Sequence, residues 1–210
     1  MRIAKEGNFI IYPLFILCFI VFLVSWYFEH SFFLSLGILC FLIFCLVFFR
    51  DPDRELPNEK NIIVSPADGI ITNIVNINDL EIGNATLISI FLNVYNVHVN
   101  RMPIDGKIIK VRNIPGKFLA AFSHKSSDEN ERTEILVDSE IGKIKIKQIA
   151  GLIAKRIICY AKQGEKMKIG NRLGYIRFGS RTDLIIPKDV NLMVKVGQKV
   201  KGNKTILVKF

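Results

Sequence analysis

The segment KIKIKQI at 143–149 alternates polar and apolar residues from Lys143 to Lys147. Successive side chains of a β-strand point to opposite faces, so this pattern predicts a strand with one buried and one polar face. Other short segments rich in Ile and Val follow residue 60 and are separated by turn residues. They predict a mainly β domain, a compact sandwich or barrel. The predicted strands are 61–64, 69–77, 86–99, 107–111, 134–137, 143–149, 156–161, 174–178, 184–186, 191–196 and 204–210.

Two internal similarities lie within this domain. DGII at 68–71 resembles DGKI at 105–108, and GEKMKIGN at 164–171 resembles GQKVKGN at 197–203. A duplication would explain them, and so would the recurrence of glycine turns in any β-protein. The segment 118–132 has no strand pattern and is predicted to be a loop or a short helix.

The N-terminal part is apolar. Residues 9–28 and 32–49 form runs of twenty and eighteen residues without a charge. Either run is long enough to cross about 30 Å of hydrocarbon as a helix. A secretory signal has a shorter apolar region and no second span directly after it. Residues 1–49 are therefore predicted to be a two-helix transmembrane hairpin.

Basic residues flank the outer ends of these runs and are absent from the joining segment. Arg2, Lys5, Arg50 and Arg54 stand at the outer ends. The positive-inside rule places both termini, and the domain that follows, on the cytoplasmic side of the cell (inner) membrane. Residues 50–60 are charged, contain two prolines and are predicted to be a linker to the domain at 61–210.

The net charge of +10 requires an explanation. The basic residues are scattered along the predicted strands and not gathered in a patch, which argues against nucleic acid. Attraction to anionic lipid headgroups is the simpler account for a domain tethered to a bilayer. Three of the four cysteines lie in the apolar runs, so no disulfide framework is expected. Only His98 and His124 lie outside the hairpin, and no metal site is expected.

The Gly179-Ser180 pair is the strongest chemical signal. The segment LGYIRFGSRTDLIIP at 173–187 reads as strand, sharp turn and strand. A serine in such a turn can attack the preceding glycine carbonyl, where no side chain blocks the approach. The resulting ester can break by β-elimination to leave dehydroalanine, which hydrolyses to a pyruvoyl group. A general base has to activate the hydroxyl.

His98 and Asp68 are the candidates for the remaining roles. A histidine on a strand and an aspartate before a glycine are each ordinary structural residues when taken alone. With Ser180 they supply a nucleophile, a general base and a carboxylate that orients the imidazole.

Seven sequence blocks in order resemble the phosphatidylserine decarboxylases, specifically their short bacterial and archaeal branch. The resemblance covers nearly the whole chain. Besides the hairpin, the matching blocks are FFRDP at 48–52, SPADG at 65–69, NVHVNRMP at 96–103, SSDENER at 126–132, GLIAKR at 151–156 and FGSR at 178–181.

This resemblance implies a self-processing enzyme with Asp68, His98 and Ser180 as its cleavage triad. Cleavage between Gly179 and Ser180 would leave a β-chain of residues 1–179 and an α-chain of residues 180–210, which remain together as a heterodimer. Ser180 would become the pyruvoyl cofactor, form a Schiff base with phosphatidylserine and accept the electron pair released with carbon dioxide. Phosphatidylethanolamine is the implied product. Whether the processed enzyme also forms a homo-oligomer is left open.

Two other functions fit parts of the sequence. MKI at 167–169 resembles the tip at which biotinyl or lipoyl carrier domains are modified, with Lys168 as the attachment site. Other pyruvoyl enzymes decarboxylate small soluble amino acids. The hairpin and the basic domain favour a lipid substrate.

Overall fold

The computed structural model describes residues 2–28, 32–117, 129–151, 157–176 and 180–210. The chain divides into two compact units, Met1–Asp53 and Arg54–Phe210, and each is described by itself.

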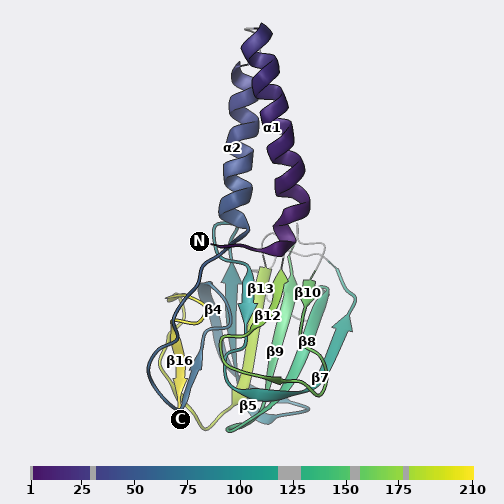
Figure 1. Ribbon diagram of the computed structural model, residues 1–210. Coiled ribbons are helices and arrows are strands. Elements are labelled where there is room, and N and C mark those ends of the chain that lie inside the picture. The colour runs from purple at the N-terminus through teal and green to yellow at the C-terminus, as the bar shows by residue number, and fades with distance from the viewer. Residues whose placement is uncertain (1, 29–31, 118–128, 152–156, 177–179) are drawn as a thin grey trace. The chain divides into compact units, whose positions relative to one another are not determined.

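The first unit contains the two predicted helices (Figure 1). The helix α1 spans Asn8–Phe28 and α2 spans Phe32–Phe48, as the apolar runs indicated. The segment Lys5–Tyr27 is long and apolar enough to cross a membrane, and α2 is a shorter apolar helix of 17 residues. Before α1 lie the short strand β1 (Arg2–Ile3), which pairs with β2 (Arg50–Asp51), and the 3-10 turn η1 (Lys5–Gly7).

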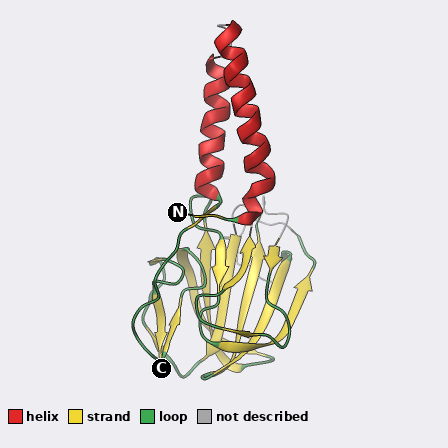
Figure 2. Ribbon diagram, in the orientation of Figure 1, coloured by secondary structure: helices red, strands yellow, loops and turns green. Residues whose placement is uncertain are grey.

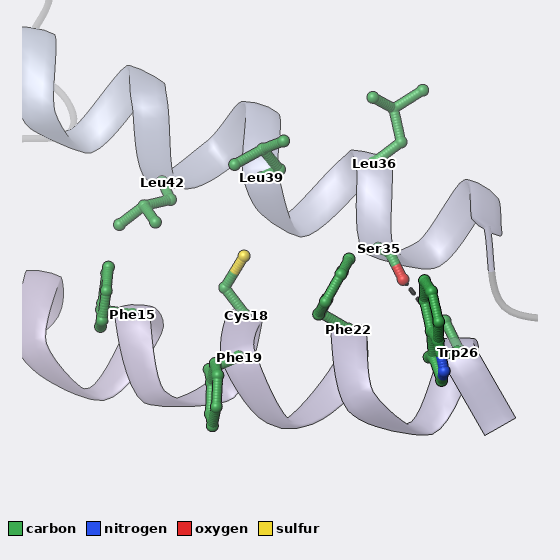
Figure 3. A pocket seen from close by; sticks show the side chains of 10 residues that line it. Phe15, Cys18, Phe19, Phe22, Trp26, Ser35, Leu36, Leu39 and Leu42 are labelled. Atoms are coloured by element: carbon green, nitrogen blue, oxygen red, sulfur yellow. Dashed lines mark hydrogen bonds between the residues drawn. The ribbon is translucent and has the colours of Figure 1, made fainter.

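The two helices face each other across an apolar groove of about 780 Å³ (Figure 3). Phe15 and Phe22 of α1 and Leu39 and Leu42 of α2 are among its lining residues. Near the loop end of the helices, the Ser25 and Ser35 hydroxyls are 2.5 Å apart, a hydrogen bond that links α1 to α2.

The second unit is built from strands, as Figure 2 shows. An eight-stranded antiparallel sheet has the order β11-β7-β8-β9-β13-β5-β4-β15, and two three-stranded sheets have the orders β10-β12-β6 and β14-β16-β3. The strands are β3 (Ile62–Val64), β4 (Gly69–Asp79), β5 (Gly83–Leu92), β6 (Val99–Arg101), β7 (Gly106–Ile114), β8 (Arg132–Ser139), β9 (Gly142–Ala150), β10 (Ile157–Cys159), β11 (Lys166–Met167), β12 (Arg172–Ile176), β13 (Ser180–Pro187), β14 (Asn191–Leu192), β15 (Lys199–Val200) and β16 (Ile206–Lys209).

One face of the large sheet carries the hydrophobic core. Ile144 and Ile146 of β9 are fully buried there, while Lys143, Lys145 and Lys147 alternate onto the other face. The predicted mainly β class and the alternation of β9 are therefore confirmed.

Ion pairs make the sheet curl about its polar face into a half-barrel. Lys145 on β9 donates to both carboxylate oxygens of Asp79 at the end of β4, at 2.7 and 2.6 Å, although β13 and β5 lie between the two strands. In the β4–β5 turn, Glu81 accepts a hydrogen bond from Arg112 of β7 at 2.8 Å. These contacts bring the β4–β5 hairpin across the face to strands far away in the sheet order.

The Asp79–Lys145 pair predicts an acid-sensitive fold. Burial raises the pKa of Asp79, but hydrogen bonds from Lys145 and its charge outweigh burial, so the net shift is downward. A lowered pKa contributes stability above the unfolded-state value of about 4, and this stability is lost as the pH falls through the folded-state pKa. We expect Asp79→Asn to lower the unfolding midpoint at neutral pH and to flatten its decline in acid. Thermal melts in detergent from neutral pH down to below about pH 4 measure the unfolding midpoint and its decline in acid. The exposed-site variant Asp138→Asn is the control. A decline as steep as in the parent would contradict the assignment.

The structure differs from the predicted strands in several places, and the predicted strands 156–161 and 191–196 are shortened to β10 (Ile157–Cys159) and β14 (Asn191–Leu192). The predicted strand 86–99 is two strands, because Asn93 and Asn96 close a turn between β5 and β6. The short strands β11 and β15 were not predicted, since two residues carry no periodic pattern. Most of the predicted loop at 118–132 lies outside the described residues.

The two internal similarities coincide with equivalent pairings at the two edges of the large sheet. Val200 of β15 pairs with Gly69 of β4, and Met167 of β11 pairs with Gly106 of β7. The contacts around each pair repeat as well: Gly197 N–H donates to the Ile71 carbonyl as Gly164 N–H donates to that of Ile108, both at 2.8 Å. This agreement favours a duplication over the chance recurrence of turns.

Candidate active site

Ser180 is the first residue of β13, in the middle of the eight-stranded sheet (Figure 1). It lies opposite Leu92 of β5 and Ala150 of β9. Its side chain is fully buried, and among the described residues its Oγ has no hydrogen-bond partner. A buried hydroxyl without a partner is unusual in a folded protein and requires a functional explanation. Gly179, the other half of the predicted cleavage site, lies outside the described residues.

His98 directly precedes β6 and is also fully buried. Its Nδ1 lies 2.9 Å from the backbone carbonyl oxygen of Asn96. A carbonyl can only accept, so Nδ1 carries the proton in the neutral imidazole and Nε2 is the basic nitrogen. The hydrogen bond thus fixes the tautomer that a general base needs.

His98 and Ser180 belong to one layer between the two packed sheets. Ile176 N–H of β12 donates to the His98 carbonyl at 3.3 Å, and Ile176 packs against Ala150, which lies opposite Ser180. We call His98, Ile176, Ala150 and Ser180 the nucleophile layer.

Asp68 lies at the same end of the large sheet. Ile70 of β4 is opposite Phe91 of β5, which places Gly69 beside Leu92, the neighbour of Ser180. Neighbouring strands are about 4.8 Å apart, so Gly69 and Ser180 are separated by about 10 Å. Asp68 and Ser180 thus lie at one end of the large sheet, and His98 lies beside β6 of the three-stranded sheet β10-β12-β6.

The Asp68 carboxylate has its own partners. It accepts hydrogen bonds from both terminal nitrogens of Arg54, the one to Nη2 at 2.8 Å, and from Gly202 N–H at 2.8 Å. The Gly202 contact belongs to the repeated architecture, because Asp105 accepts equivalently from Ile169 N–H at 2.6 Å. The Arg54 pair is particular to Asp68. Nothing in the sequence around Arg54 indicated this pairing.

Behind the nucleophile layer lies a second layer of buried polar side chains. Asn100, Gln148 and Thr182 are fully buried and follow or precede His98, Ala150 and Ser180 by two residues. With Gly174 of β12 we call them the amide layer. No sequence motif indicated these residues. The one available signal was Gln148, a polar residue on the face of β9 that carries the buried Ile144 and Ile146.

The other face of β13 holds an ion pair. Arg181 donates from Nε to Asp183 at 2.6 Å and from Nη2 to the Ser89 hydroxyl of β5 at 2.5 Å. Arg181 is 3% exposed and Asp183 is 1% exposed. Breaking a buried ion pair of this kind strongly destabilises a fold, and the hydrogen bond from Arg181 to Ser89 joins β13 to β5 directly beside Ser180.

The described residues contain no group of three or more His, Cys, Asp or Glu side chains that could hold a metal ion. Burial raises the pKa of the Cys159 thiol, which disfavours the nucleophilic thiolate. Cys159 lines a cavity of about 530 Å³ with residues of β7, β8 and β10, including Arg132 and Thr133.

Comparisons with known proteins identify the family of this chain. Residues 41–208 match the family model described as phosphatidylserine decarboxylase. Proteins named phosphatidylserine decarboxylase proenzyme are 40% identical in Chlorobaculum parvum, over 99% of this chain and 98% of the relative, and 45% identical in Wolbachia pipientis wMel, over 98% and 90%. A third, from Chlorobium chlorochromatii, is 46% identical over 81% of both chains. The carrier-domain interpretation is therefore dropped, and the chain belongs to the phosphatidylserine decarboxylase family.

Proposed function

We propose that this protein cleaves itself between Gly179 and Ser180 and then decarboxylates phosphatidylserine to phosphatidylethanolamine, releasing carbon dioxide. The products of cleavage are a β-chain of residues 1–179 and an α-chain of residues 180–210, held together as a heterodimer. The observation that carries the proposal is the fully buried Ser180 Oγ, which has no hydrogen-bond partner among the described residues and lies in one layer with His98.

In the proposed cleavage, His98 Nε2 accepts the proton of Ser180 Oγ, and Oγ attacks the Gly179 carbonyl carbon. The C–N bond of the peptide breaks, its nitrogen takes the proton from His98, and an ester remains. Loss of the Ser180 Cα proton then breaks the Cβ–O bond, releases the Gly179 carboxylate and leaves dehydroalanine at residue 180. The hydrogen bond from Nδ1 to the Asn96 carbonyl supports this role, because it keeps Nε2 unprotonated.

Asp68 is the third proposed member of the triad. In the uncleaved chain its charge is balanced by Arg54, and the Asn96 carbonyl already orients the imidazole. We therefore assign Asp68 a supporting part, stabilising the positive charge that His98 gains when it accepts a proton.

The surroundings of residue 180 suit a pyruvoyl group. Its neighbours across the sheet, Leu92 and Ala150, are apolar and fully buried, and Ser180 and a pyruvoyl group are of similar size. When formed, this group supplies a conjugated carbonyl that accepts the electron pair released with carbon dioxide. The hydrogen bond from Arg181 to Ser89 of β5 keeps the new chain end in register, and His98 is the proposed group that returns a proton, taken up at Nε2 during the reaction, to the substrate carbon.

The hairpin and the charge support a lipid substrate. We propose that α1 and α2 cross the cell (inner) membrane as a hairpin, with both termini on the cytoplasmic side. The net charge of +10 attracts the anionic headgroups of that leaflet.

The substrate is tested by release of labelled carbon dioxide from the serine carboxyl group. We expect release from phosphatidylserine in mixed micelles and none from free serine at equal concentration, because a soluble amino acid lacks the lipid part that brings the substrate to a membrane enzyme. Comparable release from free serine would contradict the lipid assignment and support an amino acid decarboxylase.

A further inference from the structure

The amide layer contains hydrogen-bonding groups that its protein contacts do not satisfy. Gln148 Nε2 donates to Asn100 Oδ1 at 2.8 Å, and the Thr182 hydroxyl lies 3.4 Å from the same oxygen. In the part of the chain that the structure describes, Asn100 Nδ2 and Gln148 Oε1 have no partner, and both residues are 0% exposed. Buried polar atoms are normally paired.

The number of unused donors and acceptors does not depend on which way the two side-chain amides are turned. If both side-chain amides are turned over, Asn100 Nδ2 donates to Gln148 Oε1, and the unused atoms become Gln148 Nε2 and Asn100 Oδ1. One donor and one acceptor are left in either case.

The fold leaves room for these amides. Gly174 lies opposite Asn100, and a Cβ at this position would stand 2.6 Å from Gln148 Nε2. Any larger residue at position 174 would therefore displace the Gln148 amide. The strand carries a glycine at the point where the amide pair is enclosed.

A water molecule can bond to one unused N–H donor and one unused oxygen acceptor at the same time. It accepts from one amide N–H and donates to one amide oxygen, and its second proton or lone pair is available to a third group. An anion would meet the unused amide oxygen, and a cation would meet the unused N–H. Residue 180 is the nearest reacting group, because it precedes Thr182 by two positions on the same face of β13, about 7 Å along the strand.

The proposed self-processing requires one water molecule at this place. After cleavage, residue 180 is dehydroalanine with a free amino group, which tautomerises to an imine. Water adds to the C=N bond, ammonia leaves, and the water oxygen becomes the carbonyl oxygen of the pyruvoyl group. In the uncleaved chain residue 180 is fully buried, so a water molecule already bound beside it is better placed to react than bulk water.

We propose that Asn100 and Gln148 bind the water that hydrolyses the processed residue 180. This inference rests on the proposed function and deepens it, since it assigns a step of the same reaction to residues outside the triad. Asn100 and Gln148 are thus positioning residues for the hydrolytic step and take no part in chain cleavage.

The test compares chain cleavage with ammonia release in the full-length protein in detergent. In the parent, we expect ammonia release to keep pace with cleavage. In Gln148→Met, which has a similar shape but no amide, cleavage should continue while ammonia release slows roughly tenfold or more, because the water is no longer held in place. During the lag, a quench into denaturant that contains a thiol should expose the dehydroalanine and give a mass-detectable adduct of the α-chain. Thr133→Val is the matched control, since Thr133 is buried on the same face and lies opposite Gln148 on β8.

The outcomes separate the two proposals. Failure of the parent to cleave would overturn the proposed function. Ammonia release that keeps pace with cleavage in Gln148→Met, or a folded Gln148→Met that does not cleave, would overturn the water assignment and leave the decarboxylase intact. If Gln148→Met does not fold, a high-resolution crystal structure of Ser180→Ala decides: a water bonded to both amides supports the proposal, and unused amide atoms bonded to protein groups overturn it.

Discussion

Replacement of Ser180 by alanine is expected to leave the protein as one chain of 210 residues without decarboxylase activity. Alanine has no oxygen to attack the Gly179 carbonyl, so neither the ester nor the pyruvoyl group can form. The fold should persist, because the Ser180 Oγ has no hydrogen-bond partner among the described residues and its removal breaks no such contact.

Gel mobility and labelled carbon dioxide release measure the two effects of Ser180→Ala. Ser139→Ala is the control, since its hydroxyl bonds an exposed turn at the Gly142 carbonyl, far along the sheet. This control should cleave and decarboxylate like the parent. A Ser180→Ala protein that still splits into two chains would show that another residue is the nucleophile.

Replacement of His98 by glutamine is expected to slow chain cleavage by about 10²–10⁴-fold, the usual contribution of a positioned general base. Glutamine can keep a hydrogen bond to the Asn96 carbonyl but has no basic nitrogen to accept the Ser180 proton. Asp68→Asn should slow cleavage less, because the Asn96 carbonyl, and not Asp68, fixes the tautomer of His98.

Cleavage time courses of His98→Gln and Asp68→Asn measure which substitution slows cleavage more. Thermal melts establish that both variants are folded. A folded His98→Gln protein that cleaves at the parent rate would remove His98 from the mechanism. A larger effect for Asp68→Asn than for His98→Gln would mean that the carboxylate leaves Arg54 and acts directly on the reacting groups.

Local patterns were sufficient to predict much of the fold. The alternation at 143–149 gave β9 with its buried and polar faces, and the uncharged runs gave α1 and α2. The curl of the sheet was not predictable in this way. It depends on Lys145 meeting Asp79 across two intervening strands, a contact between residues 66 positions apart.

The candidate site was predicted only in part for the same reason. Gly179-Ser180 carries a local signal, whereas the roles of His98 and Asp68 depend on contacts that their sequence surroundings do not indicate. The partner of Asp68 is Arg54 in the predicted linker, and the partner of His98 is a backbone carbonyl two residues away. The amide layer brings together Asn100, Gln148 and Thr182 from three strands of two sheets, an arrangement that no single segment encodes.

The intact masses of the wild-type protein after folding in membranes test the central claim most directly. The account predicts two species, residues 1–179 and residues 180–210, the smaller one blocked at its N-terminus by a pyruvoyl group in place of Ser180. A single unmodified chain of 210 residues would contradict it.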